Sequence, residues 1–331
     1  MLDLSGMRLT RSNLATPISS SGCTGTAAHV LQARIHRAQR RVDRCYCNAS
    51  QLGELRDWIC FEGGSVHPAL LLSDNAPSSG CRGIVAGQDI SLQDLEAGPL
   101  ISVPQALQFT STQALNIIEQ HAGSALAAAA AEQLSSSQLT AVALAHELQH
   151  EANSSWGPYL QTLPSKPPCP WLLTSPQQIA ECIAPYSAAR GPAAVAGWAE
   201  ATAQQRQQML DASNEAVQLL GPSLGITAEL VLQALAHVAS RSLTSGSSSG
   251  LVPFIDLVNH GAEAMGPMLQ LDDNDRLVMT VLPIRNGEAV PLAEGQELLI
   301  CYQGGYEPPE AFLKFGFVAD EWWQQEQQAQ Q

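Results

Sequence analysis

The stretch Leu251-Val252-Pro253-Phe254-Ile255-Asp256-Leu257-Val258-Asn259-His260 carries the strongest local signal in the chain. It is an apolar run that ends in the spacing Asp-x-x-Asn-His, so polar side chains finish a buried segment. Polar groups removed from water need hydrogen-bond partners. The segment alone predicts a strand over Leu251–Val258 and a capped turn in which Asn259 and His260 bond nearby backbone. The alternative is a strand that presents Asp256, Asn259 and His260 to a functional site.

The sequence on either side predicts two groups of short strands with helices between them. A flexible glycine-serine loop is expected from Ser245 to Gly250, and a hairpin turn from Asp272 to Asp275. The expected strands are Gly83–Ala86, Leu100–Val103, Met268–Leu271, Leu277–Leu282 and Glu297–Tyr302. Apolar periodicity predicts helices near residues 52–59, within 112–152, from Ser175-Pro176 onward, and over 192–219 and 227–242.

Six pieces, in order along the chain, resemble the SET-domain methyltransferases typified by the Rubisco large-subunit lysine methyltransferase and the actin-histidine methyltransferase. Leu251–His260 is similar to that group's P-x-x-D-x-x-N-H segment. The other pieces are Gly80–Ala86 with Ile101–Pro104, Leu144–Glu147 with Ser155–Pro164, Val238–Arg241, Glu297–Tyr302 and Phe315–Val318. Single pieces are weak, but their common order is specific.

The resemblance implies an α+β fold, a β-rich SET domain with short strands and knot-like C-terminal threading, interrupted by an α-helical insert. The SET domain is expected over residues 51–320. Its N-terminal part is assigned to 51–108, the helical insert to 109–242 and the C-terminal part to 243–320. A glutamine-rich tail is expected at 321–331.

The same resemblance implies the residues of the site. Tyr302 matches the catalytic tyrosine, which also contacts the substrate. Phe315 stands where the family has a substrate-channel tyrosine, so one hydroxyl is missing and the number of methyl groups added, or the residue accepted, could differ. The cofactor-binding positions are matched by Gly80, Arg82, Arg241, Asp256, Asn259, His260 and Phe317. Arg241 is expected to pair with a cofactor carboxylate, a contact that guanidinium suits.

The implied activity is transfer of a methyl group from S-adenosylmethionine to a protein nitrogen, with lysine as the expected acceptor. A chloroplast protein such as the Rubisco large subunit, or another stromal enzyme, is the implied partner. The loop after Tyr302 departs from the family pattern, and no counterpart of the relatives' C-terminal helical domain follows Val318. The substrate is therefore expected to be recognised differently, or the sequence is truncated. The alternative is a catalytically weakened SET-fold binding module.

A second motif, His146-Glu147-Leu148-Gln149-His150, matches the HExxH signature of zinc proteases. On a helix, with Ser137 as its expected cap, His146 and His150 share a face and Glu147 could activate a zinc-bound water. The sequence that follows lacks the third metzincin histidine, and only Glu181 could serve as a gluzincin glutamate. A surface helix with two polar histidines is therefore favoured, so no metal ligand is predicted. A zinc metalloprotease stays as an alternative.

Charge is distributed unevenly along the 331 residues, which carry a net charge of −15. Residues 1–50 contain seven arginines and two aspartates, a net charge of +5, which leaves −20 for the rest. An acidic body repels phosphate backbones, so nucleic acid is not an expected partner. The Ser-, Ala- and Arg-rich segment 1–50 predicts an organellar transit peptide, for the chloroplast first, with the mitochondrion and cytoplasm as alternatives. No apolar run is long enough to predict a membrane span.

Overall fold

The computed structural model describes residues 49–79, 81–245, 248–272, 274, 276–285, 287–302 and 306–323. The predicted transit peptide, except residues 49 and 50, and residues 324–331 of the predicted tail lie outside them. The helices are α2 Ala49–Phe61, α3 Leu92–Glu96, α4 Ser111–Ala122, α5 Ser124–Gln133, α6 Ser136–Gln149, α7 Gly157–Leu160, α8 Pro176–Arg190, α9 Trp198–Leu224, α10 Ala228–Arg241 and α11 Pro308–Phe315. The strands are β1 Ser65–Val66, β2 Leu70–Ser73, β3 Gly83–Ala86, β4 Ile101–Pro104, β5 Phe109–Thr110, β6 Leu243–Ser245, β7 Ser248–Leu251, β8 Asn259–His260, β9 Met268–Leu271, β10 Leu277–Val281, β11 Ile284–Arg285, β12 Glu288–Ala289 and β13 Leu299–Ile300.

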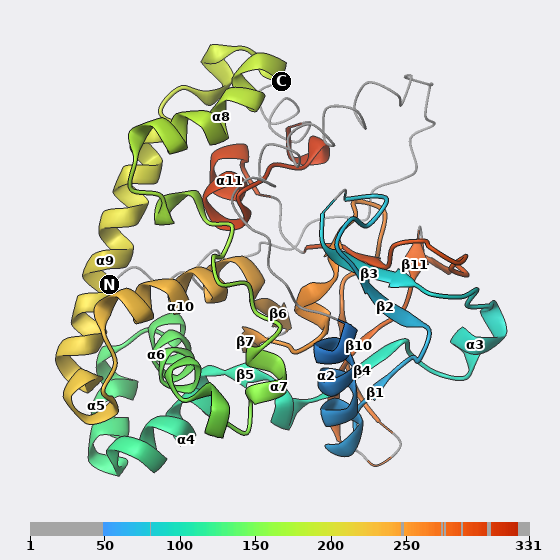
Figure 1. Ribbon diagram of the computed structural model, residues 1–331, viewed down its shortest axis with the longest axis horizontal. Coiled ribbons are helices and arrows are strands. Elements are labelled where there is room, and N and C mark those ends of the chain that lie inside the picture. Colours follow the sequence, from blue (N-terminus) through green and yellow to red (C-terminus); the bar gives the residue numbers. More distant parts are fainter. Residues whose placement is uncertain are drawn as a thin grey trace, which may run out of the picture.

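Short strands form several small sheets on one side of the molecule, and helices α4 to α10 form the other side (Figure 1). The largest sheet has the strand order β1-β4-β10-β9, with every neighbouring pair antiparallel. The α+β class predicted from the sequence is therefore confirmed.

The helical segment leaves and rejoins the strands at a single sheet of order β5-β7-β6. Phe109, just before α4, pairs with Leu251, and Leu243, just after α10, pairs with Gly250. The main hydrophobic core continues from the strands into the helices without a break. At this junction the ring of Trp156 lies 4.8 Å from Phe109 and 5.7 Å from Trp58 between centroids. The helical segment therefore stabilises the strands directly.

A second hydrophobic cluster joins α8 and the start of α9 to α11 and the residues after it. Its aromatic members include Tyr186, Trp198, Phe312, Phe315, Trp322 and Trp323. Trp198 and Trp323 stack with centroids 5.8 Å apart. Residues 321–323, which the sequence assigned to a tail, thus include two buried tryptophans that hold the C-terminal segment against the helices.

Local sequence signals located several elements well. The expected strand Gly83–Ala86 is β3, and α8 begins at Pro176 after Ser175, as predicted. The alanine-rich region forms three helices because Gly123 adopts φ 92° between α4 and α5, and Ser135 caps α6. The expected cap at Ser137 was wrong: Ser135 forms a capping box with Gln138.

Two other predictions were wrong near the central motif. The Ser245–Gly250 loop is largely a hairpin of β6 and β7, although residues 246 and 247 lie outside the described residues. The strand expected over Leu251–Val258 stops at Leu251 and is replaced by a turn and a 3-10 helix at Ile255–Leu257. Antiparallel pairing of β9 with β10 supports the hairpin after Leu271, but Asp273 and Asp275 of its expected turn are not among the described residues.

Within the described residues no single helix is long and apolar enough to cross a membrane. The segments Pro192–Leu224 and Ala228–Arg241 satisfy the criteria of length and composition as a pair, but they are bent by 115°.

Candidate active site

The central motif is a compact turn, and its backbone explains why it is not a strand. Phe254 has φ 69° and ψ −44°, a conformation that costs energy for any residue with a side chain. Its ring is fully buried, so packing stabilises the strained backbone. The amide of Asp256 then donates to the carbonyl of Val252 at 3.0 Å. The turn directs Asp256 into the interior and leads the chain into β8.

On one side of this turn lies a closed set of hydrogen bonds around Glu297, which is 3% exposed. Its Oε2 accepts from the amides of Ser78 and Ser79, both at 2.9 Å. Its Oε1 accepts from the Ser79 hydroxyl and from Nδ2 of Asn259, both at 2.8 Å. Asn259 also donates to the carbonyl of Arg82 at 2.8 Å. We call this group the Glu297 network; it joins the loop before β3 to β8 and the segment before β13.

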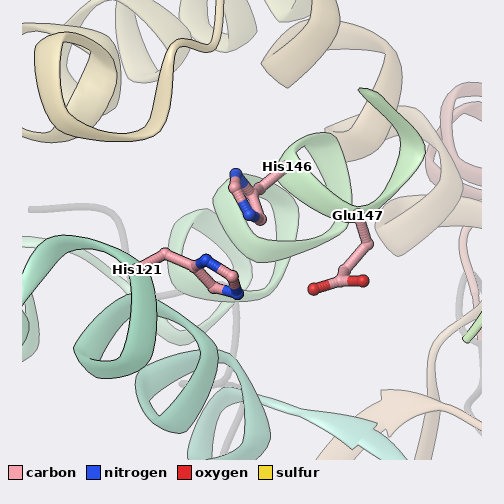
Figure 2. Close-up of side chains that lie close together, drawn as sticks. All are labelled: His121, His146 and Glu147. Atoms are coloured by element: carbon pink, nitrogen blue, oxygen red, sulfur yellow. The ribbon is translucent and has the colours of Figure 1, made fainter. Parts of the chain in front are cut away.

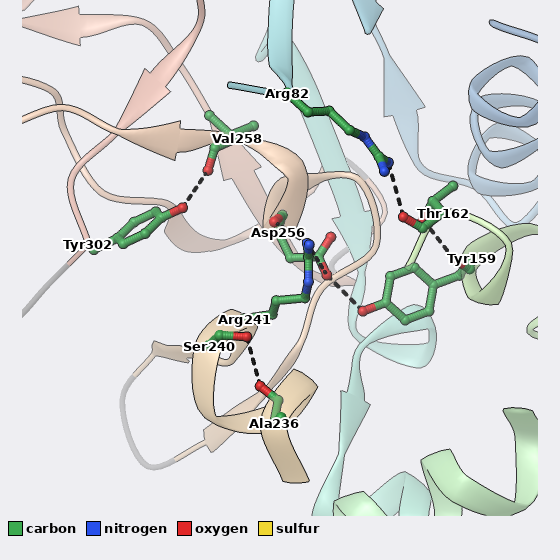
Figure 3. A network of polar contacts seen from close by, with 9 residues as sticks. All are labelled: Arg82, Tyr159, Thr162, Ala236, Ser240, Arg241, Asp256, Val258 and Tyr302. Carbon is green, nitrogen blue, oxygen red and sulfur yellow. Dashed lines mark hydrogen bonds and ion pairs between the residues drawn. The ribbon is translucent and has the colours of Figure 1, made fainter. Parts of the chain in front are cut away.

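On the other side lies a group with incomplete hydrogen bonding, which we call the Asp256 wall: Asp256, Tyr159, Arg241 and His237. Oδ2 of Asp256 accepts from the Tyr159 hydroxyl at 2.8 Å, and Nη1 of Arg241 lies 3.8 Å away (Figure 3). Nη1 of Arg241 donates to the Asp256 carbonyl oxygen at 3.0 Å. Three buried atoms of this wall have no hydrogen-bond partner among the described residues: Oδ1 of Asp256, Nε of Arg241 and Nδ1 of His237.

The electrostatics of this wall follow from burial. Burial raises the pKa of the Asp256 carboxyl above its usual value, although Arg241 and the Tyr159 hydrogen bond oppose the shift. Burial, with a smaller contribution from Arg241, lowers the pKa of His237 to about 3, so this imidazole is neutral at pH 7. Buried polar groups with perturbed pKa values beside a pocket are typical of functional sites.

A pocket opens beside the wall, and Tyr302 lies in its lining together with Arg241, Asp256, Val258, Lys314 and Phe315. The Tyr302 hydroxyl donates to the carbonyl of Val258 at 3.1 Å (Figure 3). Burial raises the pKa of Tyr302 well above its ordinary value, so the phenol keeps its proton at neutral pH. The Phe315 ring lies 5.2 Å from that of Tyr302, and Lys314 Nζ donates to the Tyr306 hydroxyl at 2.8 Å.

Asn259 and His260 diverge, because successive side chains of a strand point to opposite faces. Asn259 belongs to the Glu297 network, whereas Nε2 of His260 lies 2.5 Å from the Glu321 carboxylate. Nδ1 of His260 accepts from the Tyr302 amide at 3.1 Å, and its ring stacks on Trp322 with centroids 5.0 Å apart. Phe317 packs on the same tryptophan at 5.6 Å. The C-terminal segment therefore lies against His260 and Phe317.

The structure brings most of the predicted site residues together. Arg241, Asp256, Tyr302 and Phe315 line the pocket, and the rings of His260 and Phe317 pack on that of Tyr302. Asn259 belongs to the Glu297 network. Arg82 contributes its carbonyl to Asn259, and its guanidinium donates to the Thr162 carbonyl at 3.0 Å. Gly80 lies outside the described residues. The functional roles assigned to these positions stay predictions.

Glu297 and Tyr159 are among the residues of the site that sequence reasoning missed, as are His237 and Lys314. Glu297 and Tyr159 lie within the motif ranges Glu297–Tyr302 and Ser155–Pro164, yet neither was assigned a role. Glu297 precedes an apolar run, which is a weak sign of a buried polar anchor, and Tyr159 lies within Trp-Gly-Pro-Tyr, a short aromatic stretch. Their partners lie 219 and 97 residues away along the chain, so no local pattern identifies them.

The HExxH motif lies on α6, but α6 is not the surface helix that was expected. His146 and Glu147 are each 7% exposed, whereas His150 is exposed. Burial lowers the pKa of His146, with smaller contributions from His121 and His150 of the same sign. The motif's two histidine rings lie 4.4 Å apart, and His121 of α4 lies at the same distance from His146.

The fold is that of a SET domain. No family model and no curated protein matches the chain. Among solved structures, the SET domain of LSMT bound to lysine and AdoHcy is similar to it, with a TM-score of 0.60 and 18% identity over 83% of this chain and 58% of that one. Rubisco LSMT bound to AdoMet has a TM-score of 0.59 and 17% identity over 82% and 57%. Rubisco LSMT bound to sinefungin and monomethyllysine has a TM-score of 0.57. The chain thus spans less than three fifths of the length of these structures.

Proposed function

We propose that this protein is an S-adenosylmethionine-dependent protein methyltransferase that modifies lysine. The observation that carries the proposal is the position of Tyr302. Its hydroxyl is held on the Val258 carbonyl at a pocket that Arg241 and Asp256 also line, within a SET fold. Of the solved structures with this fold, one was determined with AdoMet, and two with AdoHcy together with lysine or methyllysine.

The pocket wall fits the polar end of such a cofactor. Nε of Arg241 is a donor and Oδ1 of Asp256 an acceptor, and both are buried without a hydrogen-bond partner among the described residues. A ligand with a carboxylate and an ammonium group suits both atoms: the carboxylate accepts from Nε of Arg241, and the ammonium donates to Oδ1 of Asp256. S-adenosylmethionine carries both groups and, when bound, supplies an activated methyl group on a sulfonium.

The residues of the chain would act by orientation and by controlling charge. The Tyr302 phenol stays protonated, so it orients an incoming amine and is not a general base at neutral pH. The aromatic rings of Tyr302 and Phe315 exclude water from the amine. A lysine must be neutral to attack, and the positive charges of Lys314 and Arg241 in the pocket lining disfavour its ammonium form. Alignment and desolvation are the main contributions that such a transfer requires.

The finer assignments are proposals of the same kind. Phe315 in place of a tyrosine supports a change in the number of methyl groups added or acceptance of histidine in place of lysine. The arginine-rich composition of residues 1–50 supports import into the chloroplast and a stromal protein as substrate, such as the Rubisco large subunit.

The test combines two measurements on the full chain: calorimetric binding of S-adenosylmethionine, and transfer of radiolabelled methyl groups to lysine peptides and stromal extract. Tyr302→Phe removes one hydroxyl from the pocket, and we expect it to bind cofactor while transfer falls at least about 100-fold. Tyr186→Phe is the matched control, because it removes a buried tyrosine hydroxyl in the second hydrophobic cluster.

The possible results separate the candidate functions. Binding and transfer by the wild type, with loss of transfer in Tyr302→Phe alone, support the methyltransferase. Binding without transfer to any substrate supports a binding module. A folded wild-type protein that binds no S-adenosylmethionine contradicts both.

A further inference from the structure

Three side chains of residue types that commonly coordinate metals lie together on the helical side of the molecule, away from the pocket. His121 is in the last turn of α4, and His146 and Glu147 are on α6, which packs against α4 (Figure 2). One ligand atom from each side chain can be chosen so that all three lie within 4.8 Å of one another. His121 is exposed and the other two are buried. We call these residues the His121 cluster.

The hydrogen bond of His146 prepares its ring for coordination. Nδ1 of His146 lies 3.4 Å from the carbonyl of Leu224, at the end of α9. A carbonyl oxygen only accepts, so Nδ1 carries the proton and the lone pair is on Nε2. Histidine ligands of metals ordinarily donate their second ring nitrogen to a carbonyl or carboxylate in this way.

Glu147 brings a negative charge that its protein neighbours do not balance. One carboxylate oxygen accepts from the Ser154 hydroxyl. Among the described residues the other oxygen has no hydrogen-bond donor, and no lysine or arginine forms an ion pair with this carboxylate. A buried carboxylate without a cation is costly. Two imidazoles and one carboxylate are a ligand set that suits a divalent transition metal, zinc above all.

We propose that His121, Nε2 of His146 and the Glu147 carboxylate form a binding site for a divalent transition-metal ion of the zinc type. Zinc–ligand bonds of about 2.1 Å in a tetrahedral arrangement place ligand atoms about 3.4 Å apart. The ligand atoms lie within 4.8 Å of one another, so coordination requires the side chains to move closer together, and His121 is the exposed one of the three. Solvent molecules fill the remaining positions. This proposal revises the sequence-based prediction that the chain has no metal ligand.

The ion has a structural role in this arrangement. It links the end of α4 to α6 and, through the His146 hydrogen bond, to the end of α9. The arrangement differs from a zinc protease, because Glu147 is a ligand here and is not free to activate water. His150 is outside the cluster, and its Nδ1 donates to the His146 carbonyl at 2.8 Å.

The test compares His121→Ala with His150→Ala in the full chain. Both histidines are exposed, and the centroid of each ring lies 4.4 Å from that of His146. Each variant therefore removes one exposed imidazole at the same distance from His146. Protein stripped with EDTA and alkylated at accessible thiols is titrated with zinc chloride by calorimetry and with cobalt(II) by visible absorption. Circular dichroism and melting temperature without metal confirm that both variants are folded.

We expect the wild type and His150→Ala to bind one equivalent of zinc and to gain melting temperature. His121→Ala should bind at least about tenfold more weakly and show no gain. The opposite pattern would assign the metal to the HExxH pair and overturn the proposal. Equal binding by all three proteins, or no binding by the wild type, would also overturn it.

Discussion

Glu297 and Asp256 are both buried carboxylates near the central turn, but they differ in how many hydrogen bonds they accept. Glu297 accepts four hydrogen bonds, from two amides, a hydroxyl and an asparagine. Asp256 accepts one side-chain hydrogen bond from Tyr159, and its Oδ1 has no partner among the described residues. The Glu297 network is closed, whereas the Asp256 wall keeps buried atoms without partners beside a pocket that Arg241 and Asp256 line.

This difference distinguishes residues that hold the fold from residues that receive a ligand. A satisfied buried network fixes one geometry and contributes to stability. Buried atoms without partners cost stability, and a protein keeps them where a ligand completes them. We therefore expect substitutions in the Glu297 network to act on folding, and substitutions in the Asp256 wall to act on cofactor binding.

The largest effect is expected for Glu297→Ala. This change removes the acceptor of four hydrogen bonds, from the amides of Ser78 and Ser79, the Ser79 hydroxyl and Asn259, so the free energy of unfolding should fall by about 3 kcal/mol. Urea denaturation measures the loss, and Glu297→Gln, which keeps one acceptor, should lose less. A fall below about 1 kcal/mol for Glu297→Ala would show that the network is not an anchor.

Gly83→Ala tests the same network by steric means. A Cβ at this position would lie 2.4 Å from Nδ2 of Asn259 and 2.6 Å from Oε1 of Glu297. Both side chains would have to move out of hydrogen-bonding geometry, and we expect a loss of about 2 kcal/mol. Gly53→Ala is a suitable control, because its Cβ would meet nothing within 4 Å. Equal denaturation midpoints for the two variants would contradict the prediction.

The Asp256 wall should respond to acid through His237. The folded-state pKa of His237 is about 3, whereas the ordinary pKa of a histidine is 6.5, so the unfolded chain binds the proton first as the pH falls. The free energy of unfolding should therefore decrease below pH 6.5, by at most about 1.4 kcal/mol per pH unit from this group. His237→Leu should flatten this dependence, as measured by urea denaturation between pH 7 and pH 5. An unchanged slope in the variant would exclude His237 as its cause.

The smallest effect on stability is expected for Asp256→Asn. Because the folded-state pKa of Asp256 is raised, its ionisation costs stability as the pH rises through that pKa, and the amide has no charge to bury. Tyr159 can still donate to the amide oxygen, so stability at pH 7 should change by less than about 1 kcal/mol. Calorimetry should nevertheless show weaker binding of S-adenosylmethionine. A large loss of stability with unchanged binding would show that Asp256 holds the fold, as Glu297 does, and does not bind the cofactor.

Local patterns were sufficient for many elements, and the resemblance to a known family was sufficient for several residues of the pocket lining. The short β-like piece Gly83–Ala86, bounded by turn residues, predicts β3, and Ser175-Pro176 predicts the start of α8, because these signals act over a few neighbouring residues. The spaced motifs predicted the SET fold and selected Arg241, Asp256, Tyr302 and Phe315, which line one pocket.

Only the tertiary structure decided which polar side chains form hydrogen bonds with one another and which residues are buried. At Phe254 the backbone turns with positive φ while the ring is fully buried, so an apolar run with the pattern of a strand does not form one. The burial of α6 and the approach of His121 to His146 depend on α4 packing beside it. Sequence determined the elements and the residue types available, because propensity and periodicity are local. The Glu297 network, the Asp256 wall and the His121 cluster depend on contacts between distant segments, which only the folded chain brings together.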